Sequence, residues 1–385
     1  TKAAPIVSHS APRLRPLDSA HDALLRAALL PPAEAVRAWE RWKSGSGGFD
    51  SLDSGGFRLL PMVYRNLSGQ DLGPADLGTV RGLYRQTWSR NRLAFRAAGD
   101  ALEVFRANGI PALALKGAAL AHIAYEEQAL RPMNDIDILV HGRQLRRAVA
   151  ALEPLGWNQV SPLRTPWKAA RMFHAILLRH QSGLELDLHR HVLEEACWKG
   201  AEEGLWDTTV AFELDTRPAH TIRPEAHLVH VIAHGVRWDP VPPVRWIADC
   251  TVLLRRFGAG WDWAFTAEFA RRLGVSRAVA AGLCYLRESL GAAVPAEAME
   301  ALLDSPASAL ERIDFRAQQA GSGPIWQSFR YTTRYLRLSS RRSLKRKAAD
   351  FPPYLQVMWQ LDSPWAVPRD AMRRVWLRAH GVSPK

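Results

Sequence analysis

Apolar residues recur along much of the chain at the three- and four-residue intervals of helices that bury one face. This pattern predicts helices over residues 33–43, 57–67 and 79–108. The apolar stripe of the longest helix comprises Leu83, Tyr84, Thr87, Trp88, Phe95, Ala98, Leu102 and Phe105. Gly109 follows this stripe, and glycine is common just beyond the end of a helix. We therefore expect the longest helix to lead directly into the first core strand.

A strand-like pattern replaces the helical one after Gly109. Short apolar runs at 110–115 and 135–140 predict two strands, and a helix is expected between them over 118–126. A further helix ends at Gly156, and two antiparallel strands are predicted near 173–179 and 184–190. From Pro224 to about Leu290 the pattern is helical again.

The length of 385 residues is enough for two or three packed units. We expect a loose lead over 1–17, a helical region over 18–108, a core over 109–221, a helical domain over 222–320 and a basic segment over 321–385. No uninterrupted apolar run approaches the length of a membrane span. The patch at 23–30 is interrupted by Arg26 and is too short for a signal peptide. Three widely separated cysteines, at 197, 250 and 284, favour a reducing compartment, so a cytoplasmic protein is expected.

Positive charge is concentrated at the end of the chain. Residues 321–385 hold thirteen Lys and Arg against three Asp, which is ten of the thirteen net positive charges. A helix predicted near 329–347 would place Arg330, Arg334, Arg337 and Arg341 on one face. Such a face could bind a nucleic-acid backbone, an anionic membrane surface or an acidic acceptor. It could equally be a solvated helix face.

Asp135 and Asp137 form the most informative polar pair in the sequence. They begin the second predicted strand, two residues apart, so their side chains project from the same face. Adjacent carboxylates repel each other, and a divalent cation such as Mg²⁺ relieves that repulsion. On spacing alone, two solvated acids at an exposed strand end explain the pair as well.

Two neighbouring segments favour the metal interpretation. Lys116-Gly117 ends the first strand just before a helix, where a lysine and free backbone N–H groups could bind phosphate. The strand at 184–190 alternates strictly and places Glu185, Asp187, His189 and His191 on one face. An acid from this strand, laid beside Asp135 and Asp137, would complete a three-carboxylate cluster. His189 and His191 beside Asp187 could also form a transition-metal site, lie around a magnesium site, or belong to a polar face packed on a loop.

In this order, these residues resemble the uncharacterised nucleotidyltransferase family of the DNA polymerase β-like superfamily. The resemblance rests on Leu115-Lys116-Gly117, Tyr125, Arg131 followed by Asp-Ile-Asp-Ile-Leu-Val at 135–140, and Asp187-Leu188-His189. It continues through 224–227, His234 and 245–249 to about Pro295. It implies an α+β fold with a polymerase β-like core, a small mixed sheet with flanking helices, between N-terminal and C-terminal helical parts. The superfamily usually has Gly-Ser at the phosphate-binding turn, so Lys116-Gly117 leaves the donor and the reaction type open.

The resemblance also implies a reaction. Two Mg²⁺ ions would assist transfer of a nucleoside monophosphate from an NTP, such as ATP, to an acceptor hydroxyl. Asp135, Asp137 and Asp187 would be the metal ligands and catalytic residues, and Asp187 would accept the proton of the acceptor. Lys116, Gly117, Arg131 and His189 are the expected nucleotide-binding residues.

Two other functions remain open at this point. The same residues could bind a nucleotide-sugar or another activated donor and modify a peptide or natural product. Alternatively, the chain could be a non-catalytic protein that binds a nucleotide, nucleic acid or peptide at a vestigial site. The acceptor itself could be a small molecule, a peptide, a protein or an RNA end.

His227, His230 and His234 lie close to one face of a predicted helix. Three imidazoles on one face could bind zinc, but successive residues one turn apart rarely converge on one ion. We therefore expect core or hydrogen-bonded histidines. The resemblance suggests Asp249 as the partner of His234.

Overall fold

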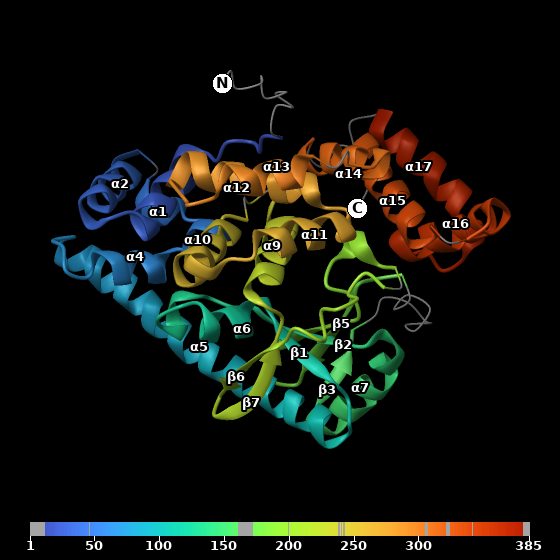
Figure 1. Cartoon of the computed structure of the whole chain (residues 1–385), viewed down its shortest axis with the longest axis horizontal. Helices are drawn as coiled ribbons and strands as arrows, with labels where there is room; N and C mark the ends of the chain where they lie inside the picture. Colours follow the sequence, from blue (N-terminus) through green and yellow to red (C-terminus); the bar gives the residue numbers. More distant parts are fainter. Residues whose placement is uncertain are drawn as a thin grey trace, which may run out of the picture.

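The computed structural model describes residues 12–45, 47–160, 172–198, 200–237, 239, 241, 243–304, 307–320, 324–340 and 342–379. Most of the predicted lead over 1–17 lies outside these residues. A mixed sheet occupies one part of the molecule, and helices lie on both sides of it (Figure 1). Within the described ranges, no helix combines the length and apolar character needed to cross a bilayer.

The sheet has seven strands in the order β3-β4-β5-β2-β1-β7-β6. The strands are β1 (Ala112–Leu115), β2 (Asp135–Val140), β3 (Trp157–Gln159), β4 (Ala175–His180), β5 (Glu185–His189), β6 (Val210–Leu214) and β7 (Arg217–Thr221). The pairs β2–β5 and β1–β7 are parallel, and the other pairs are antiparallel. Strands β1, β2, β4 and β5 lie close to the predicted ranges, whereas β3, β6 and β7 were not predicted.

Alternate side chains of the central strands pack into two separate hydrophobic cores, one on each face of the sheet. Ile136, Ile138 and Val140 of β2 pack in a core with α5 (Pro74–Ala107) and α7 (Leu145–Leu152), whereas Leu139 joins the core of the other face. Since Asp135 and Asp137 alternate with the isoleucines, they lie on the same face as Leu139. That face is covered by the C-terminal helices, beginning with α9 (Pro224–Gly235).

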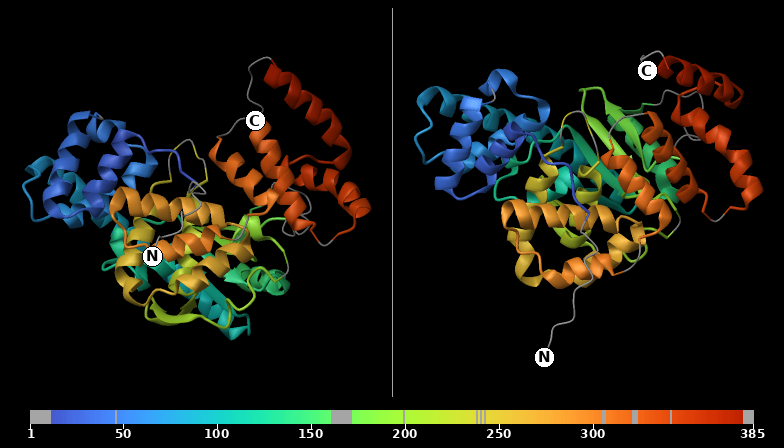
Figure 2. Two further views of the ribbon diagram at one scale, coloured as in Figure 1. Left: turned by 45° about the horizontal axis from the view of Figure 1, so that its top comes forward. Right: turned by 90° about the horizontal axis from the view of Figure 1, so that it is seen from above.

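The N-terminal helices form a group of their own beside the sheet (Figure 2). They are α1 (Ser19–Leu29), α2 (Pro32–Gly45), α3 (Ser54–Phe57) and α4 (Leu60–Leu67), with the short 3-10 helix η1 (Gly48–Ser51). The long α5 runs from this group along the sheet (Figure 1). It begins at Pro74, a favoured first-turn residue, and ends just before Gly109, whose φ of 63° confirms the predicted terminator.

Short helices connect the strands of the core. Besides α7, they are α6 (Lys116–Ile123) and the 3-10 turns η2 (Gln128–Leu130), η3 (Gly142–Gln144), η4 (Glu153–Leu155) and η5 (Glu194–Ala196). The helix predicted over 118–126 is α6, which begins earlier, directly at the end of β1. Lys116 is therefore the first helical residue, which matters for the site.

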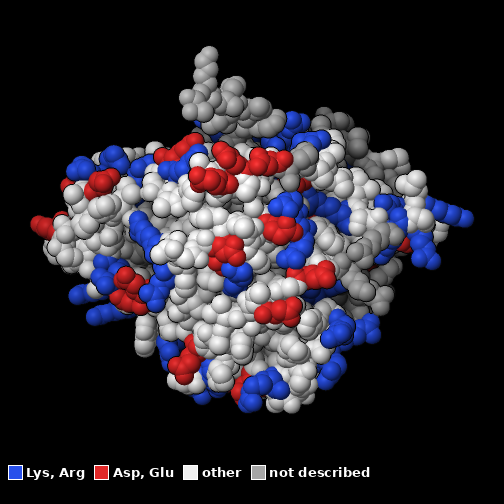
Figure 3. All heavy atoms as spheres, viewed as in Figure 1, with Lys and Arg blue, Asp and Glu red and all other residues white. Residues whose placement is uncertain are grey.

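Helices fill the rest of the chain from Pro224. They are α9, α10 (Arg245–Phe257), η6 (Gly258–Gly260), α11 (Trp263–Leu273), α12 (Ser276–Leu290), α13 (Ala296–Leu303), α14 (Ala309–Gln319), α15 (Pro324–Leu338), α16 (Leu344–Met358), η7 (Pro364–Ala366) and α17 (Val367–Ala379). The N-terminal helices (blue) and the last helices (red) lie at opposite ends of the molecule in Figure 2. The helices α9 to α13 lie between these two groups. Lys and Arg side chains gather at the right edge of Figure 3, over the last helices.

Candidate active site

Strands β2 and β5 bring the predicted acids together. They pair in parallel, with Asp137 opposite Asp187, Asp135 opposite Glu185 and Leu139 opposite His189. One ligand atom from each of Asp137, Asp187 and His189 lies within 4.8 Å of the other two. This cluster is the one group with metal-ligand geometry in the part of the chain that the structure describes. It contains two carboxylates and an imidazole where the sequence suggested three carboxylates.

Asp137 is the electrostatic centre of the cluster. Its side chain is only 2% exposed, and its Oδ1 accepts a 2.8 Å hydrogen bond from Lys116 Nζ and lies 2.9 Å from His189 Nε2. Burial raises the pKa of Asp137, but the positive charge of Lys116 and the His189 hydrogen bond outweigh it and hold the pKa well below its ordinary value. Asp137 is therefore an anion at neutral pH.

Asp187 has the opposite electrostatic behaviour. Burial and the neighbouring Asp137 charge raise the pKa of Asp187 to about 6, and Asp135 adds to this effect. A carboxyl group with a pKa near neutrality can take up and release a proton at physiological pH. Asp135 itself is half-buried at the start of β2 and lies outside the cluster. Its cross-strand neighbour Glu185 is drawn away by Arg179, at 2.6 Å.

The turn from β1 into α6 holds Lys116 in an unusual conformation. Lys116 has a φ of 38°, in the left-handed region that is costly for a residue with a Cβ. This conformation accompanies the ion pair with Asp137. Gly117 is required for space, because a Cβ there would lie 2.6 Å from Arg131 Nη1 and from Met133 Sδ. The first N–H groups of α6 begin at this turn, as expected for a phosphate-binding turn.

A family model described as an uncharacterised nucleotidyltransferase matches residues 57–291, more than half of the chain. The chain belongs to this nucleotidyltransferase family. A crystal structure of an antigenic nucleotidyltransferase-like protein from Paracoccidioides brasiliensis is similar at 14% identity, over 54% of this chain and 95% of that one, with a TM-score of 0.33. No curated protein matches the chain. The matched range contains the whole sheet, α6 and the helices α9 to α12.

The family-matched region places Arg131 away from solvent. Its guanidinium is 3% exposed and donates two 2.9 Å hydrogen bonds to Asp249 on α10. Tyr125 donates a 2.7 Å hydrogen bond to the same carboxylate. We call Tyr125, Arg131 and Asp249 the core brace. Because its charge is already paired in the interior, Arg131 joins the sheet region to α10, and the structure does not present it to a triphosphate as the sequence suggested.

The three histidines of α9 lie toward the sheet and do not form a metal site of their own in the described chain. His227 lies 2.8 Å from the Thr221 hydroxyl, and both ring nitrogens of the fully buried His230 lack a hydrogen-bond partner. The His230 ring packs edge-on against His189, 6.3 Å away. His234 is exposed to solvent. The positive charge of Lys116, followed by the protein atoms around the ring, holds the pKa of His234 well below the ordinary value. The expected His234–Asp249 pair is wrong, because Asp249 binds Arg131 and Tyr125.

One arginine of the site was missed in the sequence. Arg245, the first residue of α10, donates a 2.9 Å hydrogen bond to the Pro132 carbonyl, just before the acidic strand. Burial and the nearby Arg131 charge lower the pKa of Arg245 to about 10, and the charges of Asp249 and, less strongly, Asp135 act in the opposite direction. Arg245 is half-buried and has no carboxylate partner among the described residues, so its charge remains available. Its spacing of four residues from Asp249 was the available signal.

Two of the four arginines expected on one face of the tail helix are engaged within the protein. Arg337 is 8% exposed and binds the carbonyls of Glu195 and Gly274, with Asp314 at 3.5 Å. Arg334 pairs with Glu194. Both arginines lie beyond the family-matched range and pair with carboxylates and carbonyls inside the protein. They line a cavity of about 190 Å³, which Arg330 also lines. Arg341 lies outside the described residues.

Proposed function

We propose that the protein is a metal-dependent nucleotidyltransferase with a polymerase β-like core. It would transfer a nucleoside monophosphate from an NTP to a hydroxyl of a small molecule, a peptide or a protein. The observation that carries this proposal is the cluster of Asp137, Asp187 and His189 beside the Lys116-Gly117 turn. Metal ligands and a phosphate-binding turn are the two parts that phosphoryl-transfer enzymes need side by side.

The donor atoms of the cluster suit a divalent cation. His189 Nδ1 lies 3.2 Å from the His191 carbonyl, which can only accept, so Nδ1 carries the hydrogen in that contact. Since the ionised Asp137 carboxylate also only accepts, its 2.9 Å contact with Nε2 places a hydrogen on Nε2 as well. A divalent cation that displaced this hydrogen would take Nε2 and the Asp137 carboxylate as ligands. Metal-bound histidines commonly carry this Nδ1–carbonyl contact.

We assign the residue roles as follows. Asp137, Asp187 and His189 would hold one Mg²⁺ or similar ion, and Asp135 would share a second ion that arrives with the nucleotide. The ions would neutralise the triphosphate and orient it for in-line displacement. Lys116 and the N–H groups from Gly117 onward would bind its phosphates, with Arg245 in the place first expected of Arg131.

Asp187 is the proposed base. With its pKa near 6, it is mostly ionised at neutral pH and can accept the proton of the acceptor hydroxyl. The acceptor oxygen then forms a bond to the α-phosphorus while the bond to the β-phosphate oxygen breaks, and pyrophosphate leaves with the electron pair. The cysteines are free and buried, which suits a reducing compartment, and we propose the cytoplasm.

The test is an assay of transfer with defined donors. The protein is incubated with Mg²⁺ or Mn²⁺, each NTP and a panel of hydroxyl acceptors, and pyrophosphate release and the mass of the acceptor are measured. We expect release that Asp187→Asn abolishes and Glu213→Gln, which changes an exposed strand carboxylate outside the site, leaves intact. Consumption of nucleotide-sugars in place of NTPs would move the proposal to the second donor class. Metal-independent binding without turnover would favour a non-catalytic nucleotide-binding protein.

A further inference from the structure

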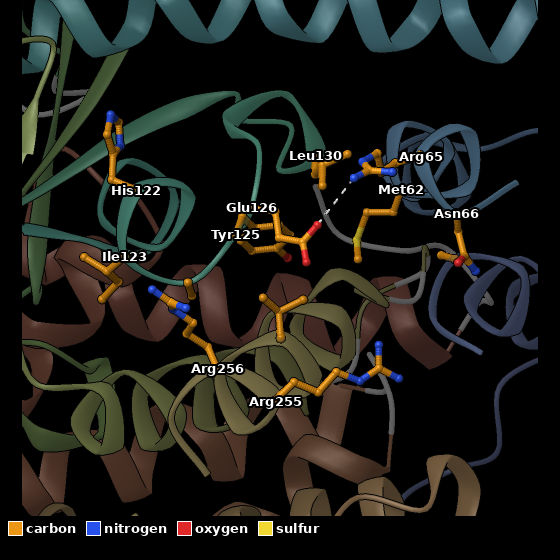
Figure 4. Close-up of a pocket in the computed structure, with 13 residues that line it drawn as sticks. Met62, Arg65, Asn66, His122, Ile123, Tyr125, Glu126, Leu130, Arg255 and Arg256 are labelled. Carbon is orange, nitrogen blue, oxygen red and sulfur yellow. Dashed lines mark ion pairs between the residues drawn. The ribbon is translucent and has the colours of Figure 1, made fainter. Parts of the chain in front are cut away.

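A second cavity, of about 830 Å³, lies at the end of α6 opposite to Lys116 (Figure 4). Since α6 has eight residues, its two ends are about 12 Å apart. The cavity is enclosed by α1, α4, α10 and the segment that follows α6. None of the metal-cluster residues lines it. Its volume is in the range of sites that enclose molecules of nucleotide size.

The charge around this cavity is positive and incompletely paired. Arg65, Arg255 and Arg256 line it, against Glu126 as the one lining carboxylate. Arg65 is engaged by Glu127 at 2.6 Å and by Glu126 at 3.7 Å. Arg255 and Arg256 have no carboxylate within ion-pair distance in the described ranges, and Arg255 donates only to the Leu29 carbonyl, at 2.7 Å. Burial lowers the pKa of Arg255, and no anion offsets it.

Both arginines are exposed and have no carboxylate partner among the described residues, whereas other arginines of the protein are engaged by carboxylates. Arg131 and Arg237, for example, each bind a carboxylate through two nitrogens. Arg255 and Arg256 diverge from the last turn of α10, Arg255 toward Asn66 and Arg256 toward Ile123 (Figure 4). The lining also includes the apolar side chains of Met62, Leu130 and Val252, beside polar groups such as Tyr125 and Glu126.

We propose that this cavity binds an organic phosphate of about nucleotide size. Its phosphate groups would bind the guanidinium groups of Arg255 and Arg256 separately, on two sides of the cavity, because a guanidinium matches phosphate oxygens in geometry and charge. Its less polar part would pack on Met62, Ile123 and Leu130. The site is separate from the proposed catalytic cluster, and it does not depend on the reaction proposed above.

The test measures binding without divalent metal. Isothermal titration calorimetry of the full chain in EDTA uses pyrophosphate, AMP and ATP as phosphate probes, citrate as a carboxylate probe and adenosine as the uncharged reference. We expect at least one phosphate probe to bind, citrate and adenosine to bind at least tenfold more weakly, and the affinity to fall as salt rises. Arg255→Gln/Arg256→Gln should weaken the phosphate probe at least tenfold, whereas Lys116→Gln should retain it.

Two further variants keep the result interpretable. Arg256→Gln alone removes a side chain with no ion pair among the described residues, so it should weaken binding severalfold at an unchanged Tm. Arg271→Gln/Arg272→Gln changes the equivalent pair in the last turn of α11 and should have no effect. The proposal is overturned if no phosphate probe binds at millimolar concentration, if citrate binds as tightly as the phosphates, or if the α11 pair matters equally. It is also overturned if Lys116→Gln, and not the α10 pair, abolishes binding.

Discussion

Asp137 and Asp187 are cross-strand neighbours with opposite electrostatics, and this difference has a measurable consequence. Asp187 has its pKa raised to about 6 by burial and by Asp137. A carboxyl group with a raised pKa in the folded state costs stability as pH rises from about 4 to 6, because the folded protein binds the proton more tightly than the unfolded chain. In metal-free protein, Asp187→Asn should therefore raise the stability at pH 8 by about 1–2 kcal/mol and leave it nearly unchanged at pH 4. Thermal unfolding in EDTA at both pH values measures this.

The Asp137→Asn variant should behave in the reverse way. Its pKa is held well below the ordinary value, so the ionised group stabilises the folded state above its unfolded pKa, and that stability is lost as the pH falls. Removing the charge leaves Lys116 and His189 without their shared partner. We expect a loss of about 2–4 kcal/mol at pH 8 that remains nearly as large at pH 4 and declines only at lower pH. If both variants shift the Tm in the same direction at pH 8, the assigned electrostatics are wrong.

His189 should determine which metal the cluster prefers. Imidazole nitrogen favours transition metals, whereas Mg²⁺ prefers oxygen ligands. His189→Gln places an amide oxygen near the Nε2 position, so the ratio of Mn²⁺ to Mg²⁺ affinity should fall about tenfold. Binding of Mn²⁺ alone, followed by its EPR signal and by competition with Mg²⁺, measures the ratio without any turnover. His191→Gln is the matched control, because that imidazole faces Glu202, 3.1 Å away. An unchanged ratio in the His189 variant would exclude the imidazole as a ligand.

At the scale of elements, much of the core was predictable from local pattern. The strict alternation at 184–190 and the apolar run at 135–140 correctly gave β5 and β2, and the expectation that an acid of β5 lies beside β2 is confirmed by the register of Asp137 with Asp187. The short strands β3, β6 and β7 escaped prediction because few residues in each carry a burial pattern; β7 pairs with β1 through a single parallel position, Ala114 with Thr221. The pairing of Arg131 with Asp249 could not be predicted, because the charge pattern along a chain does not reveal a partner 118 residues away.

The core brace and Arg245 can be separated by mutation. Arg131→Lys cannot keep both hydrogen bonds to Asp249 in the interior, so it should destabilise the protein by about 3 kcal/mol. At temperatures below the melting range of this variant, its nucleotide affinity should be close to that of the wild type. Arg245→Gln should do the opposite, with a small change in Tm and a nucleotide affinity at least tenfold lower. Differential scanning calorimetry and titration with a non-hydrolysable NTP distinguish the two, and exchanged phenotypes would restore Arg131 as the phosphate ligand.

Over the whole molecule, contacts between distant segments decide what the basic end of the chain does. The sequence shows thirteen Lys and Arg after residue 320 but not which of them find acids within the protein. Arg337 contacts the Glu195 carbonyl, 142 residues earlier, and a helix-wheel argument has no means of foreseeing that contact. The exposed side chains that remain near the end include Trp365, Met372 and Trp376.

This long-range packing gives a prediction for the tail. Arg337→Gln removes a buried charge that Asp314 and two carbonyls hold, so we expect a loss of about 2–3 kcal/mol. Arg330→Gln, one of the same four arginines but without an ion pair in the described chain, should change stability by less than about 0.5 kcal/mol. Urea unfolding of both variants is the measurement. Equal midpoints would mean that Arg337 is as free as the sequence suggested.

The core brace also limits how the molecule can move. The residues proposed to bind metal and phosphate come from two parts of the molecule. One part is the sheet with α6, and the other is α9 with α10. Asp249 joins α10 to the sheet region through buried hydrogen bonds to Arg131 and Tyr125, and separating the two parts would break all of these bonds together. A hinge at this contact is therefore disfavoured. We expect ligands to enter and leave through rearrangement of side chains and loops, while α10 and the sheet move together.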